Sequence, residues 1–474
     1  MSRRRLLQLS AIGGTAVLTG FDASGADGLV DRGRSPGPEP QVVVPPPAPT
    51  ADPANGVTFF AESEFSSEAH DLNFQVLFAL GGVGYGAGET GEIIATINQI
   101  QAAGPSYQTY YDNFVDTGIR VAALADSALK AGHLASARSA YLRAAQYFDQ
   151  ALYFVLATST PAAEPTVYAA MQRQWNLAAL LMDPPFERVA IPYGKTTLPG
   201  YFLKASTSNV RRPTVIVNNG SDAQLVDIYA WGGAAGLERG YNVLLFEGPG
   251  QGSVLFQRQI GFRPDWEHVI SPIVDWLRAR PDVDTKRIGL TGWSFCGESV
   301  ARAAAFEHRL GAVCSDPGIV DAWLAWPTSI RSLFSQNTTQ AQVDAIWTND
   351  IVPHVTDPSE KFGFTKRSEI YGAAFLSAAR AGRLFPSLWE FGQTAMQYNC
   401  GDVVDRIDTP YLVMNYELEN FYPGGAQSLF GALPGRKTLA TMTTADGAEY
   451  HDAPMAPQRR NQVVFDWLDD TMRV

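Results

Sequence analysis

Residues 287–298, RIGLTGWSFCGE, place a serine where a buried strand is expected to turn sharply into a helix. Apolar residues precede Gly292, and the small-residue run 299–306 favours a helix. A serine on such a turn holds its hydroxyl above the sheet, where a base and a carbonyl substrate can both reach it. We therefore predict that Ser294 is a catalytic nucleophile. The alternative is a turn serine without a chemical role.

The pattern of the chain predicts an α/β fold. Residues 57–185 are expected to form a helical domain, with an amphipathic stripe along 134–152. Residues 186–474 are expected to form a second domain, a mostly parallel sheet with helices on both faces. Its pattern begins with a strand pair and continues with short apolar runs between helical segments: 189–193, 198–203, 214–218, 242–246, 287–293, 311–315 and 411–414. Residues 319–406, rich in tryptophan, interrupt this alternation and are predicted to form a lid.

The N-terminus is predicted to be a targeting segment. Residues 1–31 carry paired arginines before a mild apolar stretch, which resembles a twin-arginine export signal. Residues 32–56, with a cluster of prolines, are expected to be a linker. We therefore expect an exported protein, periplasmic or secreted. The alternative is a basic N-terminus that arose by chance.

Composition limits the partners that we expect. The 474-residue chain has a formal net charge of −12, which argues against a nucleic-acid partner. No long apolar run follows residue 20, so we expect no membrane partner. Residues 247–252 are glycine-rich but lack a P-loop lysine, and no cluster has metal-ligand spacing. The sequence therefore indicates a small-molecule substrate and neither cofactor nor metal.

An activated serine needs a base, and the base needs an orienting acid. His451 lies in a loop before the closing helix 458–472, where the histidine of such a triad belongs. Two carboxylates follow the strand near 411, Glu417 and Glu419. We predict Glu419, four residues before Pro423, as the acid, with Glu417 or Asp316 as alternatives. His354, inside the predicted lid, is expected to be structural or a substrate contact.

A developing oxyanion needs preorganised donors. We predict the backbone N–H of Phe295 as one donor and Ser221, in the loop 218–222, as the other. The alternative for that loop is a plain glycine turn. The three cysteines are expected to be buried thiols, although a disulfide between Cys314 and Cys400 is an alternative.

Taken together, these motifs resemble a subgroup of α/β-hydrolases with an N-terminal helical domain. The subgroup includes 2,6-dihydroxypseudooxynicotine hydrolase and fungal pigment-pathway enzymes that shorten polyketides, which cleave carbon–carbon bonds beside a ketone. Cys296 in place of a glycine, Glu419 in place of an aspartate and Tyr450 in place of an acidic residue depart from its pattern. The segments that carry the resemblance are 141–147, 191–201, 248–252, 292–297 and 447–451.

The resemblance implies a serine hydrolase with a Ser–His–Glu triad that acts on a small or medium carbonyl substrate. An ester is the first expectation, because an ester leaving group needs no special proton donor. Hydrolysis of a carbon–carbon bond beside a ketone is the alternative. An alternative of another class is a non-catalytic binding protein that keeps the hydrolase fold.

Overall fold

The computed structural model describes residues 59–60, 68–208, 210–334 and 337–474. The predicted export signal (1–31) and linker (32–56) lie outside the described residues. The described residues all belong to one compact unit, so the boundary between the two predicted domains stays a prediction. Within the described part of the chain, no helix is long and apolar enough to cross a membrane.

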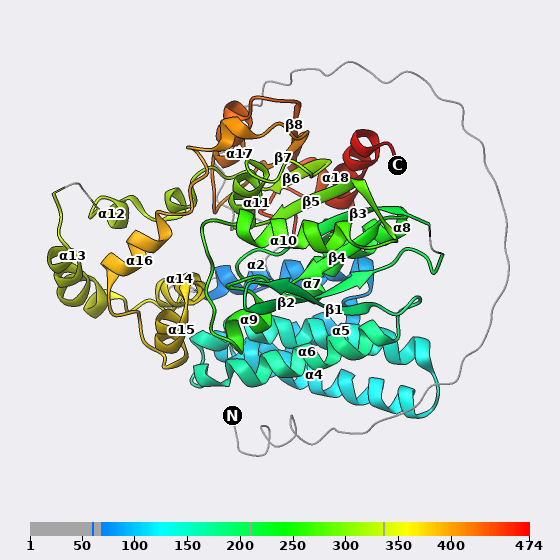
Figure 1. Cartoon of the computed structure of the whole chain (residues 1–474). Helices are drawn as coiled ribbons and strands as arrows, with labels where there is room; N and C mark the ends of the chain where they lie inside the picture. The colour runs from blue at the N-terminus through cyan, green and yellow to red at the C-terminus, as the bar shows by residue number, and fades with distance from the viewer. Residues whose placement is uncertain (1–58, 61–67, 209, 335–336) are drawn as a thin grey trace. The chain divides into compact units, whose positions relative to one another are not determined.

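The N-terminal part of this unit, residues 68–180, is helical, and its longest helices pack closely (Figure 1). A Cβ atom at Gly118 would lie 3.1 Å from the ring of Phe148, so the glycine lets α4 and α5 approach each other. The predicted stripe on 134–152 is buried except for Leu134, which lies in the exposed stretch 131–136. The helices are α2 (Glu68–Gly81), α3 (Thr90–Ala103), α4 (Tyr107–Lys130), α5 (Leu134–Phe154) and α6 (Glu164–Leu180).

An eight-stranded sheet follows, in the order β1-β2-β4-β3-β5-β6-β7-β8. The pairs β1–β2 and β2–β4 are antiparallel, and all the other pairs are parallel. The edge strand β8 was not predicted, because it is mostly exposed or half-buried and lacks an apolar run. The strands are β1 (Glu187–Tyr193), β2 (Thr196–Leu203), β3 (Arg212–Asn218), β4 (Asn242–Phe246), β5 (Val283–Trp293), β6 (Ala312–Asp316), β7 (Tyr411–Tyr416) and β8 (Lys437–Met442).

Helices cover both faces of this sheet, as the sequence predicts. Gly289 of β5 faces Leu468 and Met472 of α18 (Pro457–Met472), whereas Gly292 of the same strand faces Val300 of α11 (Cys296–Ala304). Residues three apart on a strand point to opposite faces, so α11 and α18 lie on opposite sides. Helix α10 (Glu267–Arg278) packs beside α11, and α8 (Ala234–Glu238) packs beside α18.

The helical segment between β3 and β4 is interrupted. It consists of α7 (Leu225–Ile228), a wide turn at Tyr229–Gly233 and then α8. Trp231 and Gly232 have non-helical backbone angles, and a Cβ atom at Gly232 would lie 3.2 Å from Val217 of β3. Close packing on the sheet therefore overrides the local preference for a continuous helix.

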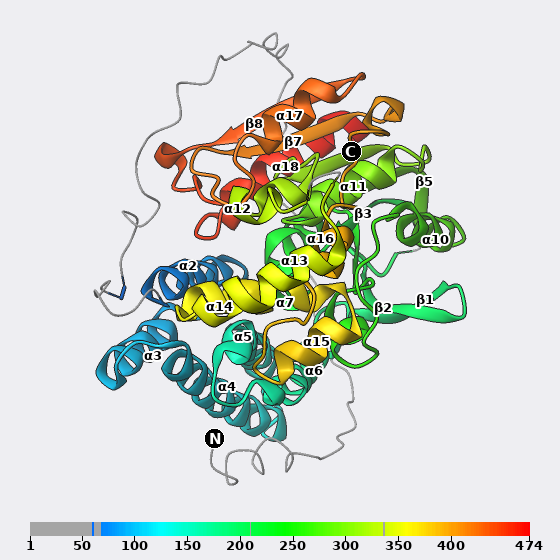
Figure 2. The same cartoon turned by 90° about the vertical axis from the view of Figure 1, so that its left-hand side faces the viewer.

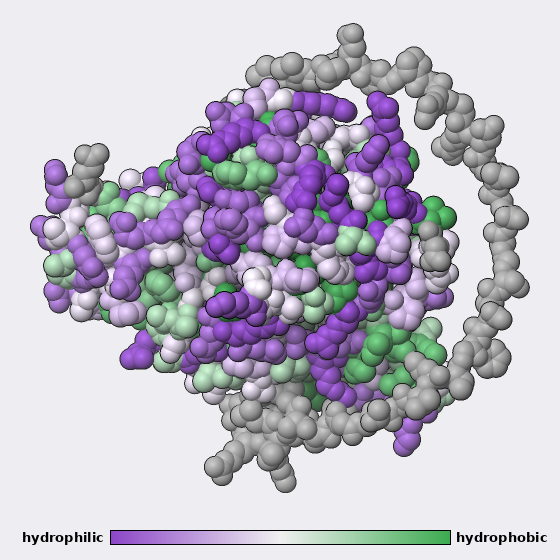
Figure 3. Space-filling view, viewed as in Figure 1, coloured by the Kyte–Doolittle hydropathy of each residue, from purple (hydrophilic) through white to green (hydrophobic). Residues whose placement is uncertain are grey.

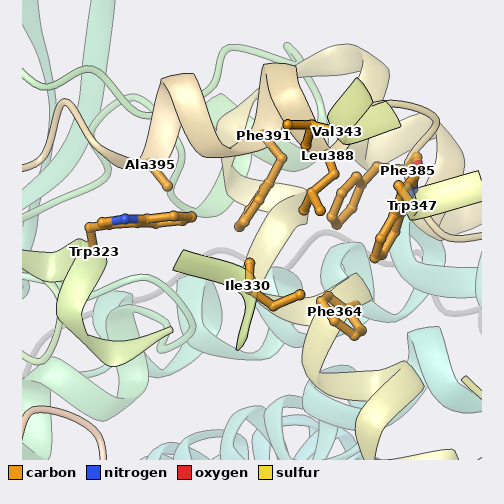
Figure 4. Close-up of a cluster of buried hydrophobic side chains, with 9 residues drawn as sticks. All are labelled: Trp323, Ile330, Val343, Trp347, Phe364, Phe385, Leu388, Phe391 and Ala395. Carbon is orange, nitrogen blue, oxygen red and sulfur yellow. Dashed lines mark hydrogen bonds between the residues drawn. The ribbon is translucent and has the colours of Figure 1, made fainter. Parts of the chain in front are cut away.

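The insertion, residues 319–406, has an aromatic core of its own (Figure 4). The rings of Trp347 and Phe385 stack at 4.7 Å, and those of Phe385 and Phe391 at 4.8 Å. Helix α14 of the insertion lies beside α2 of the helical part (Figure 2). On the face of the molecule that Figure 3 shows, polar residues predominate. The helices of the insertion are α12 (Thr328–Arg331), α13 (Gln340–Ile346), α14 (Pro358–Ser368), α15 (Ala373–Arg380) and α16 (Leu388–Ala395).

Candidate active site

Ser294 lies on the predicted turn between β5 and α11. Its backbone is left-handed, with φ 52°, which is uncommon for a residue other than glycine. The Ser294 N–H donates to the carbonyl of Asp316 at 2.6 Å, and the Ser294 carbonyl accepts from the Gly297 N–H at 2.8 Å. These bonds hold the serine at the carboxyl ends of the strands, where parallel α/β sheets bind ligands.

Small residues around Ser294 permit this turn. A Cβ atom at Gly292 would lie 2.3 Å from the carbonyl oxygen of Cys296, and one at Gly297 would lie 2.0 Å from that of Pro317. The side chain of Cys296 is fully buried, and its sulfur lies 3.7 Å from the Nε2 of Gln251. The cysteine is thus accommodated in the core, while the glycine requirement falls on positions 292 and 297.

The loops after β7 and β8 run side by side and bring Glu419 and His451 together. Leu418 and Tyr450 form a parallel bridge, and the Leu418 N–H donates to the carbonyl of Glu449 at 2.9 Å. Because each of these two bridge residues directly precedes a predicted site residue, the bridge aligns Glu419 with His451.

The three predicted side chains form a continuous relay. Ser294 Oγ lies 2.9 Å from Nε2 of His451, and His451 Nδ1 lies 2.9 Å from both carboxyl oxygens of Glu419. The backbone N–H groups of Phe421 and Tyr422 donate to Glu419 Oε1 at 2.9 and 3.1 Å and fix its orientation.

The other predicted candidates lie elsewhere. Glu417 accepts from the Thr444 N–H at 2.7 Å, at the surface. Asp316 is fully buried and pairs with the guanidinium of Arg460 at 2.5 Å. His354 is exposed and bonds through Nδ1 to the carbonyl of Asp350 at 2.8 Å. The structure therefore brings the carboxyl group of Glu419 to His451, whereas the side chains of Glu417, Asp316 and His354 lie elsewhere.

A second carboxyl group, that of Asp452, reaches the same imidazole. Its Oδ2 lies 3.2 Å from Nε2 of His451, and both side chains are buried. Burial has the largest effect and lowers the pKa of His451. The carboxylates of Asp452 and Glu419 more than offset it and raise the pKa to about 9. Burial has the opposite effect on Asp452 and raises the pKa of that carboxyl group, whereas the charge of His451 lowers it and favours the carboxylate.

The predicted loop 218–222 lies directly against Ser294. A Cβ atom at Gly220 would lie 2.8 Å from the Ser294 Cβ. Gln251 donates through Nε2 to the carbonyls of Asn219 and Gly220 at 2.7 and 3.0 Å, so the glycine-rich segment 247–252 supports this loop. Within the described residues, the backbone N–H groups of Ser221 and Phe295 donate to no other group.

The relay opens into a cavity of about 370 Å³, whose walls come from three parts of the chain. Helices α2 and α5 supply one wall, the loops of the sheet supply a second, and the insertion covers the remainder, as predicted for a lid. Aromatic side chains dominate the lining: Phe74, Phe78, Tyr153, Trp293, Phe295, Trp326, Phe364, Tyr371, Phe421 and Tyr422. Such a cavity suits a molecule with an apolar or aromatic body.

Several polar residues of the cavity were not predicted. Asp149, Asp227, Arg367 and Asp452 all line it. Asp452 follows the predicted histidine directly, and Asp149 occupies a core-spaced position on the stripe of α5, where an acid is unusual. Those two signals could have identified them, whereas Arg367 and Asp227 carry no comparable sequence signal.

The three cysteines all lie in the core. Cys296, Cys314 and Cys400 are free, buried thiols, as expected. In the part of the chain that the structure describes, no group of three or more His, Cys, Asp or Glu side chains is placed to hold a metal ion.

Comparisons with known proteins agree with this architecture. The model of a family described as "Esterase FrsA-like" matches residues 118–344. The hydrolase LUC6 of Fusarium sp. is 34% identical over 258 residues, which cover 53% of this chain and 61% of that protein. The chain therefore aligns with about three-fifths of that relative. The α/β hydrolase xenA of Xenoacremonium sinensis is 28% identical over 380 residues, 76% of this chain and 83% of the relative.

Among solved structures, 2,6-dihydroxy-pseudo-oxynicotine hydrolase superposes with a TM-score of 0.63 at 19% identity. The match covers 83% of this chain and 95% of that one. These similarities confirm the resemblance drawn from the motifs and the fold predicted from it.

Proposed function

We propose that this chain, which has the α/β-hydrolase fold, is a serine hydrolase with Ser294, His451 and Glu419 as its triad. The relay from Ser294 Oγ to His451 and on to Glu419, with 2.9 Å at each step, carries this proposal. Nucleophile, base and orienting acid at hydrogen-bond distance are the minimal apparatus for attack on a carbonyl carbon.

In the proposed reaction Ser294 Oγ attacks the substrate carbonyl while His451 Nε2 takes its proton. Glu419 holds the ring and favours the protonated imidazole that forms. The free N–H groups of Phe295 and Ser221 would receive the negative charge on the carbonyl oxygen. His451 then protonates the leaving group, and water releases the acyl group from Ser294 by the same steps.

The proposed substrate is a small or medium carbonyl compound with an aromatic or apolar body, first of all an ester. Support comes from the aromatic lining of the 370 Å³ cavity and from the match to an esterase family model over residues 118–344. A second reaction, hydrolysis of a carbon–carbon bond beside a ketone, is favoured by one observation: a buried carboxylic acid, Asp149, lines the same cavity.

A fluorophosphonate probe and a panel of p-nitrophenyl esters test the proposal. The wild-type protein should be labelled and should turn over short esters, whereas Ser294→Ala should do neither. Ser299→Ala, which changes a buried serine on α11 outside the cavity, is the matched control and should keep both properties. Equal labelling of wild type and Ser294→Ala, with no turnover of any ester, would indicate the non-catalytic binding protein instead.

We also propose that the protein is exported and acts without a nucleic-acid or membrane partner. The paired arginines near the start of the chain and the net charge of −12 support this. Replacement of Arg3 and Arg4 by lysine should retain the protein in the cytoplasm of a host with twin-arginine transport. Unchanged export of the double variant would contradict the signal.

A further inference from the structure

A carboxylic acid that the triad does not use faces the nucleophile's cavity. Asp149 of α5 and Asp227 of α7 both line this cavity together with Ser294 and His451, and both aspartates are buried, at 5% and 4% exposure. The two carboxyl groups are hydrogen-bonded to each other. Carboxylates repel each other, so this contact needs a proton between them.

The surroundings of the pair show which aspartate holds that proton. Asp227 accepts from Gln146 Nε2 at 2.9 Å and from the backbone N–H of Gln224 at 2.7 Å, as a carboxylate does. Among the described residues no N–H group donates to Asp149, which offers its own O–H to Asp227. Burial first, and then the charge of Asp227, raise the pKa of Asp149 well above the ordinary range. Asp149 is therefore a neutral acid within the cavity.

The pair adjoins the loop that faces Ser294. Helix α7, which carries Asp227, begins three residues after Asp222, and its N-cap Gln224 is the residue bonded to Asp227. When a substrate carbonyl is held between Ser294 and the loop 218–222, the two aspartates would therefore lie close to the part of the substrate beyond that carbonyl. The insertion contributes the aromatic side chains of Trp326, Phe364 and Tyr371 to the same cavity.

We infer that Asp149 is a further catalytic residue, which donates a hydrogen bond to an oxygen of the leaving half of the substrate. The inference rests on the proposed function, because Ser294 must first attack the carbonyl. A neutral carboxylic acid in an apolar site stabilises a developing enolate in this way. The substrates that need it are those with poor leaving groups, such as 1,3-diketones.

A 1,3-diketone would react through an enolate and an acyl-serine. Ser294 Oγ bonds to one carbonyl carbon, and its proton passes to His451. The carbon–carbon bond then breaks, and its electron pair moves into the second carbonyl to give an enolate. Asp149 turns its O–H from Asp227 to the enolate oxygen, while Asp227 keeps its two N–H donors. His451 returns the proton to the enolate carbon, a ketone leaves, and water converts the acyl-serine to a carboxylic acid.

The test compares two substrates, p-nitrophenyl acetate and 1-phenylbutane-1,3-dione. The first has a leaving group that departs without help, and the second does not. In Asp149→Leu, kcat on the diketone should fall about 100-fold, the usual loss for one transition-state donor, against about threefold on the ester. Asp149→Asn, which keeps an N–H donor, should fall less on the diketone than Asp149→Leu.

Two controls keep the result interpretable. The rate of fluorophosphonate labelling of Ser294 reports whether each variant has a folded, assembled site. Asp126→Asn removes a carboxylate outside the cavity that accepts from the Tyr141 hydroxyl at 2.6 Å. This variant should change kcat on the ester and on the diketone by the same factor. Equal losses on both substrates in labelled Asp149 variants would overturn the inference. So would a wild type that hydrolyses the ester but not the diketone. Absence of labelling in wild type would instead refute the proposed function itself.

Discussion

Oδ2 of Asp452 lies 3.2 Å from Nε2 of His451, the ring nitrogen that also meets the Ser294 hydroxyl. Asp452 adopts a left-handed backbone, with φ 63°, and its other carboxyl oxygen is buried and has no hydrogen-bond partner among the residues that the structure describes. A carboxyl group held in this way favours the imidazolium over the neutral imidazole, and only the neutral form can take the proton of Ser294.

This contact predicts an alkaline pH dependence that Asp452→Asn should relax. The pKa of His451 is raised to about 9, so kcat/KM on p-nitrophenyl acetate should rise with pH through the neutral range. Removing the Asp452 charge lowers the histidine pKa. The acidic limb of the pH–rate profile should therefore move to lower pH in the variant.

Asp446→Asn is the matched control for this experiment. Asp446 lies in the same loop but is partly exposed and pairs with Arg459 at 3.0 Å. Its removal should leave the acidic limb in place. A profile of Asp452→Asn that superimposes on wild type would show that Asp452 does not set the charge state of His451.

A second prediction separates the two glutamates that the sequence could not. Glu419→Gln keeps the size of the side chain but removes the charge that orients and stabilises the imidazolium, so kcat should fall about 10³–10⁴-fold. Glu417→Gln removes an equal charge two residues away, where the carboxylate accepts from the Thr444 N–H at the surface, and kcat should fall less than about threefold. Similar losses in both variants would contradict the assignment of the acid.

The sequence predicted the turn at Ser294 and the meeting of Ser294 with His451 because each of these residues lies in a local pattern. Ser294 directly follows a strand whose last residues are buried, and His451 precedes an amphipathic helix. Glu419 was preferred over Glu417 only by its distance from Pro423. The parallel bridge between Leu418 and Tyr450, which selects it physically, is a tertiary contact and leaves no local signal.

The rest of the site depends on segments that are distant in the chain. Arg367 of the insertion pairs with Asp222 of the loop beside Ser294, 145 residues away in sequence. Asp149 meets Asp227 across 78 positions, and neither residue is informative by itself. β8 was missed because an edge strand needs no apolar run. Sequence patterns thus locate groups on single elements, whereas the packing between elements decides which groups meet.

Gly297 should be intolerant of substitution. A Cβ atom there would lie 2.0 Å from the carbonyl oxygen of Pro317, which is backbone and cannot turn aside. Gly297→Ala should therefore lower the free energy of unfolding by about 1–3 kcal/mol in a urea titration. Gly431→Ala, in a helix position with no atom within 4 Å of the added methyl group, should be neutral or slightly stabilising. The opposite order of stability would contradict the packing at the nucleophile turn.

The buried ion pair between Arg460 and Asp316 gives a last prediction, on stability. The guanidinium of Arg460 is 1% exposed, contacts Asp316 at 2.5 Å and donates to the carbonyl of Trp231 at 2.7 Å. Arg460→Met would leave the Asp316 carboxylate buried without its cation, so the free energy of unfolding should fall by about 3–5 kcal/mol.

Arg459→Met provides the comparison from the adjacent position. Arg459 is 41% exposed and pairs with the partly exposed Asp446, so its loss should cost less than about 1 kcal/mol. Because Asp316 also accepts the N–H of Ser294 through its backbone carbonyl, Arg460→Met should slow fluorophosphonate labelling as well. Equal stability of the two variants in urea would contradict a stabilising role for the pair of Arg460 and Asp316.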